Sequence, residues 1–89
     1  MLDIAIEYLG TVFFLYVIIV TGNPVAIGAA LALAVYLGGP ISGGNFNPAV
    51  TVLMVMAKKQ PVSCLVPYIA AQFAAALTVY YLYTSLKHN

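Results

Sequence analysis

The sequence has 89 residues, of which 64% are hydrophobic and 6% are charged, and its formal net charge is +1. A soluble domain of this length would carry roughly 22 charged side chains, whereas this chain has only Asp3, Glu7, Lys58, Lys59 and Lys87. Small soluble domains bury the smallest share of their surface, so they cannot hide so much apolar area. The composition therefore predicts an integral membrane protein embedded in a lipid bilayer.

Several function classes are excluded by what the sequence lacks. With no arginine and a net charge near zero, the chain offers no basic surface for nucleic acid. Cys64 has no second cysteine with which to form a disulfide or a cysteine metal site, and His88 in the polar tail is typical of a solvated residue. No Ser–His–Asp, Cys–His or paired-carboxylate arrangement is present. We expect no enzyme activity, no metal and no cofactor.

The first two apolar segments predict helices over residues 4–20 and 25–37. The first is long enough to cross a bilayer core of about 30 Å. The connection that follows suits a tight turn, with Asn23 as a helix cap and Pro24 at the first helical position. Residues 38–48 contain four glycines and two prolines, which oppose a regular helix. We therefore expect the second helix to stop at residue 37, short of a full crossing.

A third apolar segment, residues 48–57, covers only about 15 Å as a helix and ends at two lysines that belong at a water interface. We expect a re-entrant loop that goes in as extended backbone and returns as a half-helix, before a last crossing over residues 62–84. The predicted fold is an all-α integral membrane protein, one unit over 1–89, with three transmembrane helices and one re-entrant half-helix. Lys58 and Lys59 on one side against Lys87 on the other favour a cytoplasmic N-terminus.

Small residues recur at four-residue spacing in two of the predicted helices, in the rows Gly28/Ala32, Ala30/Ala34/Gly38, Ala70/Ala74 and Ala71/Ala75. Such rows let helix backbones approach closely in lipid. The alternative is that they only reflect the abundance of alanine in membrane helices.

The start of the half-helix carries the most informative residues. Asn47 at the N-cap and Pro48 at the first helical position form a strong helix start. When its side-chain oxygen caps the helix, the amide NH₂ group of Asn47 stays free to bind the oxygen of a neutral solute, while the positive end of the helix dipole repels cations. Irregular backbone at membrane depth is tolerated only against protein or water. We therefore expect the carbonyl groups of residues 43–46 to form a ladder of acceptors leading to Asn47.

Two polar residues inside the predicted helices need partners. A carboxylate in a membrane helix costs about 2.5 kcal/mol or more unless it is paired. We expect Glu7 to accept backbone N–H groups of the loop and so hold the loop carbonyl groups outward. The alternative is a hydrated Glu7 at the interface, one turn from Asp3. Gln72, near the middle of the last helix, would brace the same loop or a helix–helix contact.

Three motifs, in this order, resemble the first repeat of the major intrinsic protein family, the aquaporins and aquaglyceroporins. Residues 7–11 (EYLGT) resemble the E-x-x-G-T of the family's first helix, and residues 41–51 (ISGGNFNPAVT) resemble its S-G-x-x-x-N-P-A-V-T signature. Residues 68–72 (YIAAQ) resemble its third helix. The resemblance implies a passive channel for water or small neutral solutes such as glycerol.

The resemblance also implies roles for particular residues. Its pore motif is Asn47, Pro48 and Ala49, and the carbonyl groups that would line the path belong to Gly43, Gly44, Asn45 and Phe46. Ile27 matches a filter position that is commonly aromatic, which implies a wider or more apolar constriction. Asn45 stands where the family often has a histidine.

Only one of the family's two repeats is covered, and Val50 follows the motif where the family's second repeat has an arginine. We therefore expect a pore only with a second inverted repeat, either as part of a longer product or supplied by another chain or an antiparallel copy, in a dimer or a higher oligomer. One alternative is a truncated, non-conducting half-channel that binds and modulates full-length relatives. Others are an inactive fragment, or a small proton-coupled exporter that uses Glu7 but leaves the half-helix unexplained.

Overall fold

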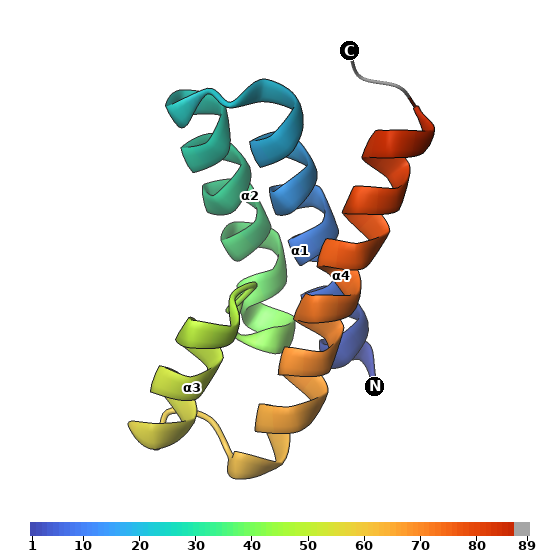
Figure 1. Cartoon of the computed structure of the whole chain (residues 1–89). Helices are drawn as coiled ribbons and strands as arrows, with labels where there is room; N and C mark the ends of the chain where they lie inside the picture. The colour runs from blue at the N-terminus through green and yellow to red at the C-terminus, as the bar shows by residue number, and fades with distance from the viewer. Residues whose placement is uncertain (87–89) are drawn as a thin grey trace.

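A computed structural model describes residues 1–86 as a bundle of α-helices, drawn in Figure 1. The elements in chain order are α1 (Leu2–Thr21), α2 (Pro24–Ser42), α3 (Pro48–Met56), the single 3-10 turn η1 (Val62–Cys64) and α4 (Leu65–Ser85). Within residues 1–86 there is no β-strand. Lys87 and His88, to which the sequence assigned a topological role and a solvated tail, lie outside the described residues.

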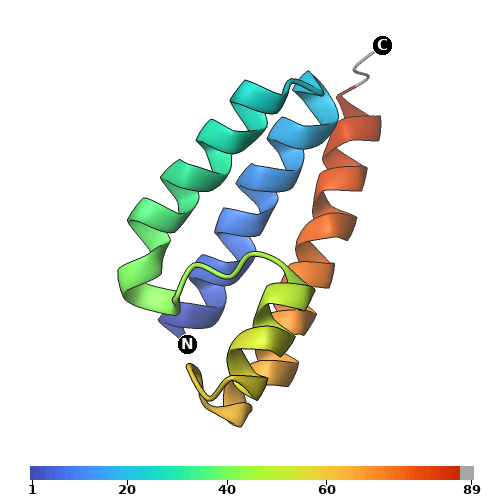
Figure 2. The same cartoon turned by 90° about the vertical axis from the view of Figure 1, so that its left-hand side faces the viewer.

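Three of the helical segments are long and apolar enough to cross a membrane: Leu2–Thr21, Pro24–Ser42 and Val62–Ser85. Figures 1 and 2 show that α2 runs back alongside α1 and that α4 runs in the direction of α1, so α1 begins and α4 ends at opposite ends of the bundle. α3 has 9 residues and spans about 14 Å, too little for a crossing. The predicted all-α membrane fold with three crossing helices and one shorter helix is confirmed.

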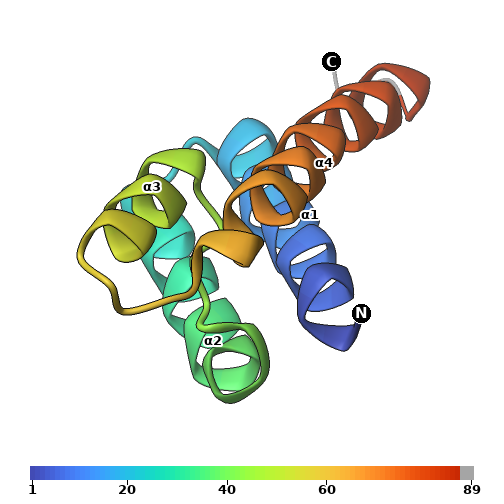
Figure 3. The same cartoon turned by 90° about the horizontal axis from the view of Figure 1, so that it is seen from below.

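The central helix is α1, which packs against α2 on one side and α4 on the other, whereas α2 and α4 meet through the hydrogen bond from Tyr68 Oη to the carbonyl oxygen of Ser42. Figure 3 shows this order from below, with α3 set to one side against the first turns of α4. Two rows of small residues are buried in the bundle, Ala30/Ala34/Gly38 on α2 and Ala71/Ala75 on α4. The rows Gly28/Ala32 and Ala70/Ala74 are exposed.

α2 is longer than the sequence predicts, because it continues through Gly38 and Pro40 to Ser42. The expectation that it stops at residue 37 was wrong. Pro40 is exposed and lies in the last turn, so its missing N–H removes a single helical hydrogen bond. Ser42 is held by two tertiary hydrogen bonds, from its Oγ to Glu7 Oε2 (2.7 Å) and from Tyr68 Oη to its carbonyl oxygen (2.8 Å). Tertiary contacts thus override a poor local helix propensity.

The loop from α2 to α3 has no regular secondary structure over residues 43–46, and its backbone is not the uniformly extended segment that the sequence predicts. Gly43, Gly44 and Phe46 adopt left-handed backbone angles, with φ of 95°, 66° and 55°. The two glycines reach these angles without strain. A left-handed phenylalanine costs of order 1 kcal/mol and persists only where its surroundings fix it. The loop therefore depends on the contacts that hold Phe46.

Candidate functional site

Glu7 is the centre of a buried hydrogen-bond network that joins α1 to the loop. None of its surface is exposed, which contradicts the hydrated alternative. Its Oε1 accepts from Phe46 N at 2.8 Å and from Gln72 Nε2 at 2.9 Å, and its Oε2 accepts from Ser42 Oγ at 2.7 Å and from Asn45 N at 3.1 Å. All four acceptor positions of the carboxylate are filled by neutral donors.

These bonds set the direction of the loop carbonyl groups. The described peptide bonds are all trans, and in a trans peptide the C=O points away from the N–H of the same plane. Because the N–H groups of Asn45 and Phe46 point at Glu7, the carbonyl groups of Gly44 and Asn45 point away from it. No described residue donates a hydrogen bond to the carbonyl oxygens of residues 43–46. The loop therefore presents open acceptors on the side opposite α1.

Gln72 on α4 and Thr51 on α3 complete the network. Gln72 Nε2 donates both to Glu7 Oε1 and to Thr51 Oγ1, the latter at 2.8 Å. Thr51 is fully buried; its Oγ1 also accepts from Asn45 Nδ2 at 3.1 Å and donates to the carbonyl oxygen of Asn47 at 3.2 Å. Gln72 Oε1 is buried without a partner in the described part of the chain. Its amide orientation is nevertheless fixed, since the reverse orientation would set an oxygen against the carboxylate of Glu7.

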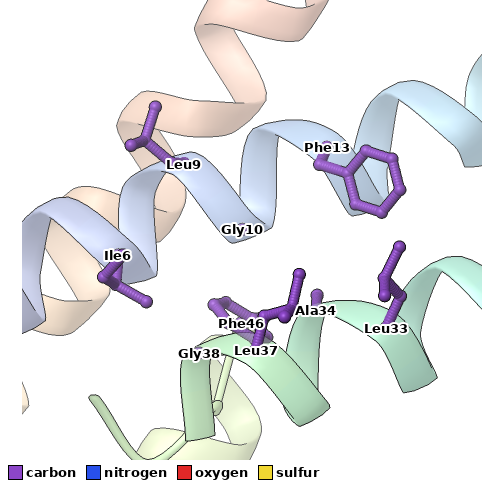
Figure 4. A pocket seen from close by; sticks show the side chains of 9 residues that line it. All are labelled: Ile6, Leu9, Gly10, Phe13, Leu33, Ala34, Leu37, Gly38 and Phe46. Atoms are coloured by element: carbon purple, nitrogen blue, oxygen red, sulfur yellow. The ribbon is translucent and has the colours of Figure 1, made fainter. Parts of the chain in front are cut away.

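Phe46 holds the loop by its side chain. The ring is 2% exposed and lies between α1 and α2, where Gly10 and Gly38 leave room for it. A Cβ atom on Gly10 would overlap the ring, and one on Gly38 would lie 2.9 Å from its Cζ atom. Beside the ring lies a pocket of about 320 Å³, shown in Figure 4. Its lining is apolar, with Phe13 and Leu33 at its far side, so it offers no hydrogen bonds to a polar solute.

Asn47 presents the free donor of the site. Its Oδ1 caps α3 by accepting from Ala49 N at 2.8 Å, and its φ of −160° is extended backbone. The side chain is exposed, and no described residue accepts a hydrogen bond from its Nδ2 atom. The positive end of the α3 dipole lies at the same point. The exposed amide donor of Asn47 and the N-terminus of α3 therefore lie on the same face of the molecule, beside the loop carbonyl groups that have no hydrogen-bond donor among the described residues.

The structure places the remaining predicted site residues in different surroundings. Pro48 is half-buried and Ala49 is exposed beside Asn47 at the start of α3. Ile27 is half-buried in the first turns of α2, at the opposite end of that helix from the loop, and is not brought together with Asn47. Asn45 is buried, its side chain is bonded to Thr51 and Gln60, and its carbonyl group points away from Glu7 because the N–H group of Phe46 points toward it.

Four residues of the network were not assigned a role from the sequence: Ser42, Thr51, Gln60 and Tyr68. Thr51 follows Asn47 by one helical turn, a spacing at which side chains share a face, and this signal was available. Ser42 and Tyr68 lie within the motifs of residues 41–51 and 68–72, but nothing in the sequence indicates the hydrogen bond between them. Gln60 carries no local signal, because its partner Asn45 lies 15 positions away.

We expect Tyr68→Phe to lower the free energy of unfolding by about 1 kcal/mol, the usual net value of one hydrogen bond. The ring is 3% exposed, so phenylalanine keeps its packing but loses the bonds to the Ser42 carbonyl oxygen and, at 3.3 Å, to Asp3 Oδ2. Unfolding in detergent micelles, followed by circular dichroism, measures the change. Tyr80→Phe is the matched control, since Tyr80 is 66% exposed on the same helix. Equal stability of the two variants would contradict the assignment of Tyr68.

Together, the fold and the site define a helical membrane protein with a buried carboxylate that organises a loop and a short helix whose capped asparagine is exposed. The chain belongs to the major intrinsic protein family, whose sequence profile matches residues 17–89. The family is one of passive channels and facilitators rather than enzymes, and the protein is an integral, multi-pass membrane protein.

Curated relatives include uptake facilitators and an aquaporin. The chain is 48% identical over 63 residues to the propanediol uptake facilitator of Salmonella typhimurium, a match that covers 66% of this chain and 24% of the relative. It is 39% identical over 80 residues to a glycerol uptake facilitator-like protein of Lactiplantibacillus plantarum, covering 80% and 37%. It is 39% identical over 56 residues to aquaporin Z of Brucella melitensis, covering 63% and 25%.

The chain thus spans well under half the length of these relatives. No solved structure gives a significant match to it.

Proposed function

We propose that this chain is a single half-repeat that forms one half of a passive pore for water and small neutral solutes such as glycerol. A second inverted repeat, or an antiparallel copy of the chain, would complete the pore. The observation that supports the proposal most directly is the exposed amide group of Asn47, which lies at the N-terminus of α3 beside the open loop carbonyl groups.

The geometry suits the transfer of a hydroxyl-bearing solute out of bulk water. A water molecule or polyol that enters the pore loses hydrogen bonds to bulk water. The loop carbonyl groups accept bonds from its hydrogens, and Asn47 Nδ2 donates to its oxygen. The dipole of α3 opposes cations at the same point. Glu7 supports this arrangement from behind, because its bonds to two backbone N–H groups keep the carbonyl groups turned outward.

Small polyols are the solutes that we propose beside water. Two of the relatives are named for the uptake of propanediol or glycerol. In this chain, Ile27 is an apolar residue at the position that resembles the family's filter, and the sequence holds no arginine. In a pore made of two antiparallel copies of this chain, the constriction would therefore be apolar and without arginine, which favours the carbon backbone of a polyol over a strictly water-sized path.

The need for a second half follows from the surface that carries Asn47. Open backbone groups are tolerated at membrane depth only against protein or a water-filled cavity, and here Gly43 and Asn47 are exposed and Gly44 is half-buried. We propose that an inverted second half faces this surface, with the N-terminus of the present half in the cytoplasm. Liposomes that contain only this chain test the antiparallel copy. A water or glycerol permeability above that of empty vesicles supports it, and a folded, inserted chain with no such permeability requires a different second half.

Asn47→Asp tests the donor separately from the helix cap. Aspartate caps a helix as well as asparagine does, so α3 should keep its start, but the carboxylate replaces the NH₂ donor with a negative charge. We expect water permeability, measured by stopped-flow light scattering, to fall at least about tenfold, because a charge at membrane depth is costly. Asn23→Asp makes the same change at the cap of α2, where Asn23 Oδ1 accepts from Ala26 N at 2.9 Å, and should leave permeability unchanged. Equal permeability of Asn47→Asp and the unmodified chain would refute the proposed donor.

A further inference from the structure

The chain reverses direction immediately after α3 and brings Gln60 back to the loop that precedes the helix. Lys58 adopts a left-handed conformation with φ of 60°. The N–H groups of Lys59 and Gln60 then both donate to the carbonyl oxygen of Met54, at 2.9 and 3.2 Å. This tight turn fixes the Gln60 backbone below α3, with its side chain directed toward the loop.

Gln60 and Asn45 form a reciprocal pair of amide hydrogen bonds. Asn45 Nδ2 donates to Gln60 Oε1 at 2.8 Å, and Gln60 Nε2 donates to Asn45 Oδ1 at 3.0 Å. Asn45 is 4% exposed and Gln60 is half-buried. The amide of Gln60 also fills the space beside Gly43, where a Cβ atom would overlap Nε2. The pair therefore joins the loop before α3 to the turn after it. The Gln60 amide fills the space in which a side chain at position 43 would lie.

We propose that Gln60 is a positioning residue of the pore loop, an inference that rests on the proposed function where it concerns permeation. Asn45 is held at three points: its N–H by Glu7, its Nδ2 by Thr51 and Gln60, and its Oδ1 by Gln60. The hydrogen bond from Asn45 N to Glu7 turns the Gly44 carbonyl group outward. The two side-chain bonds between Asn45 and Gln60 keep Asn45 in the orientation that this bond requires. Gln60 thus acts on the solute path through Asn45, without touching the solute.

Gln60→Glu gives this clamp a protonation-dependent switch. A carboxylate at position 60 still accepts from Asn45 Nδ2 but cannot donate to Asn45 Oδ1, whereas the protonated acid donates its O–H and restores the pair. Other titratable or charged groups near the loop are Glu7 on α1, Lys58 and Lys59 on the turn, and Asp3 and Tyr68, which meet beside Ser42. The unmodified chain contains all of these groups. Their contribution is therefore removed when the pH dependence of its protection factors is subtracted from that of the variant.

The first readout is amide hydrogen exchange of Asn45 and Phe46 in lipid nanodiscs, expressed as protection factors, which are corrected for the intrinsic effect of pH. For Gln60→Glu at about pH 7.5, we expect protection factors about tenfold below those of the unmodified chain, because one buried hydrogen bond is lost. At about pH 4.5 the bond returns, and the protection factors should lie within about twofold of those of the unmodified chain. Gln60→Met, which keeps the length but removes both bonds, should lose protection at both pH values. Ser63→Glu adds a carboxylate at an exposed position of the neighbouring η1 and should change nothing.

The second readout is permeability of the same variants in liposomes, which should fall for Gln60→Glu at the higher pH and return at the lower one. Protection factors that are the same in Gln60→Glu, Gln60→Met and the unmodified chain would overturn the positioning role. A variant that has lost protection but keeps the full permeability of the unmodified chain would overturn it as well. Hydrogen exchange requires no pore. If no variant and no unmodified chain conducts while protection changes as expected, the proposed channel function of the isolated chain fails and the clamp stands.

Discussion

Glu7→Gln should lower the free energy of unfolding by about 2–4 kcal/mol and, in the proposed pore, abolish permeation. Glu7 accepts four hydrogen bonds, two of them from the backbone N–H groups of Asn45 and Phe46. Glutamine offers one oxygen and sets an NH₂ group against the remaining donors. The Ser42 hydroxyl can rotate to accept from it, but a backbone N–H cannot. Each buried donor left without a partner costs about 1–3 kcal/mol, and a released N–H also releases the carbonyl group of its peptide plane from its outward direction.

Unfolding by a titration of denaturing detergent, followed by circular dichroism, measures the stability, and stopped-flow light scattering measures permeability. Asp3→Asn is the matched control, since Asp3 is the other carboxylate of α1 and its ion pair with the N-terminal ammonium group is exposed. Exposed ion pairs contribute about 0–1 kcal/mol, so this variant should stay within that range. If Glu7→Gln destabilises the protein no more than Asp3→Asn does, the carboxylate does not organise the loop.

The sequence contained the information for the parts of the structure that depend on local chemistry or on the membrane. Apolar length predicted the first and last crossing segments but made the second one too short, and the sequence Asn47-Pro48 predicted the start of α3 within a residue. The case of Glu7 rests on a similar argument. A carboxylate in a membrane helix needs donors, and the irregular loop was the segment with N–H groups to spare, so a contact between the two could be expected without knowledge of the packing.

The features that the sequence did not predict are those created by packing between distant segments. α2 continues through Pro40 because Glu7 and Tyr68 hold its last residue, and neither contact has a signal within the helix itself. A left-handed backbone conformation is unfavourable for phenylalanine, so the sequence around Phe46 does not predict it. The conformation is found here because the ring packs between α1 and α2. Gln60 is likewise an ordinary residue of a polar turn until the fold brings it to Asn45. Such pairs become visible only when the whole bundle is built.

Gly10→Ala should destabilise the protein, although alanine is the better helix former. In an open helical position glycine to alanine gains about 0.5–1 kcal/mol, and Gly28→Ala, where a Cβ atom would meet nothing within 4 Å, should show this gain. At Gly10 the new Cβ atom would overlap the Phe46 ring. Gly38 lies on the other side of the ring and Glu7 holds the Phe46 backbone, so the ring can avoid the overlap only by turning into the apolar pocket beside it, at the expense of its present packing. Overpacking of this kind costs about 1–3 kcal/mol, so the two variants should differ in sign.

The double variant Gly10→Ala with Phe46→Ala identifies the obstacle. Phe46→Ala alone should cost about 3–5 kcal/mol through the cavity that it leaves, and it should expose the loop amides at positions 45 and 46 to exchange, since the ring holds this left-handed residue together with the bond from its N–H group to Glu7. With the ring removed, alanine at position 10 no longer meets it, and the penalty of Gly10→Ala should disappear. The coupling between the two sites, from the four unfolding curves of the cycle, is therefore the quantity to measure. A Gly10→Ala penalty of the same size in the Phe46→Ala background would mean that Gly10 is needed for the approach of the helices rather than for the ring.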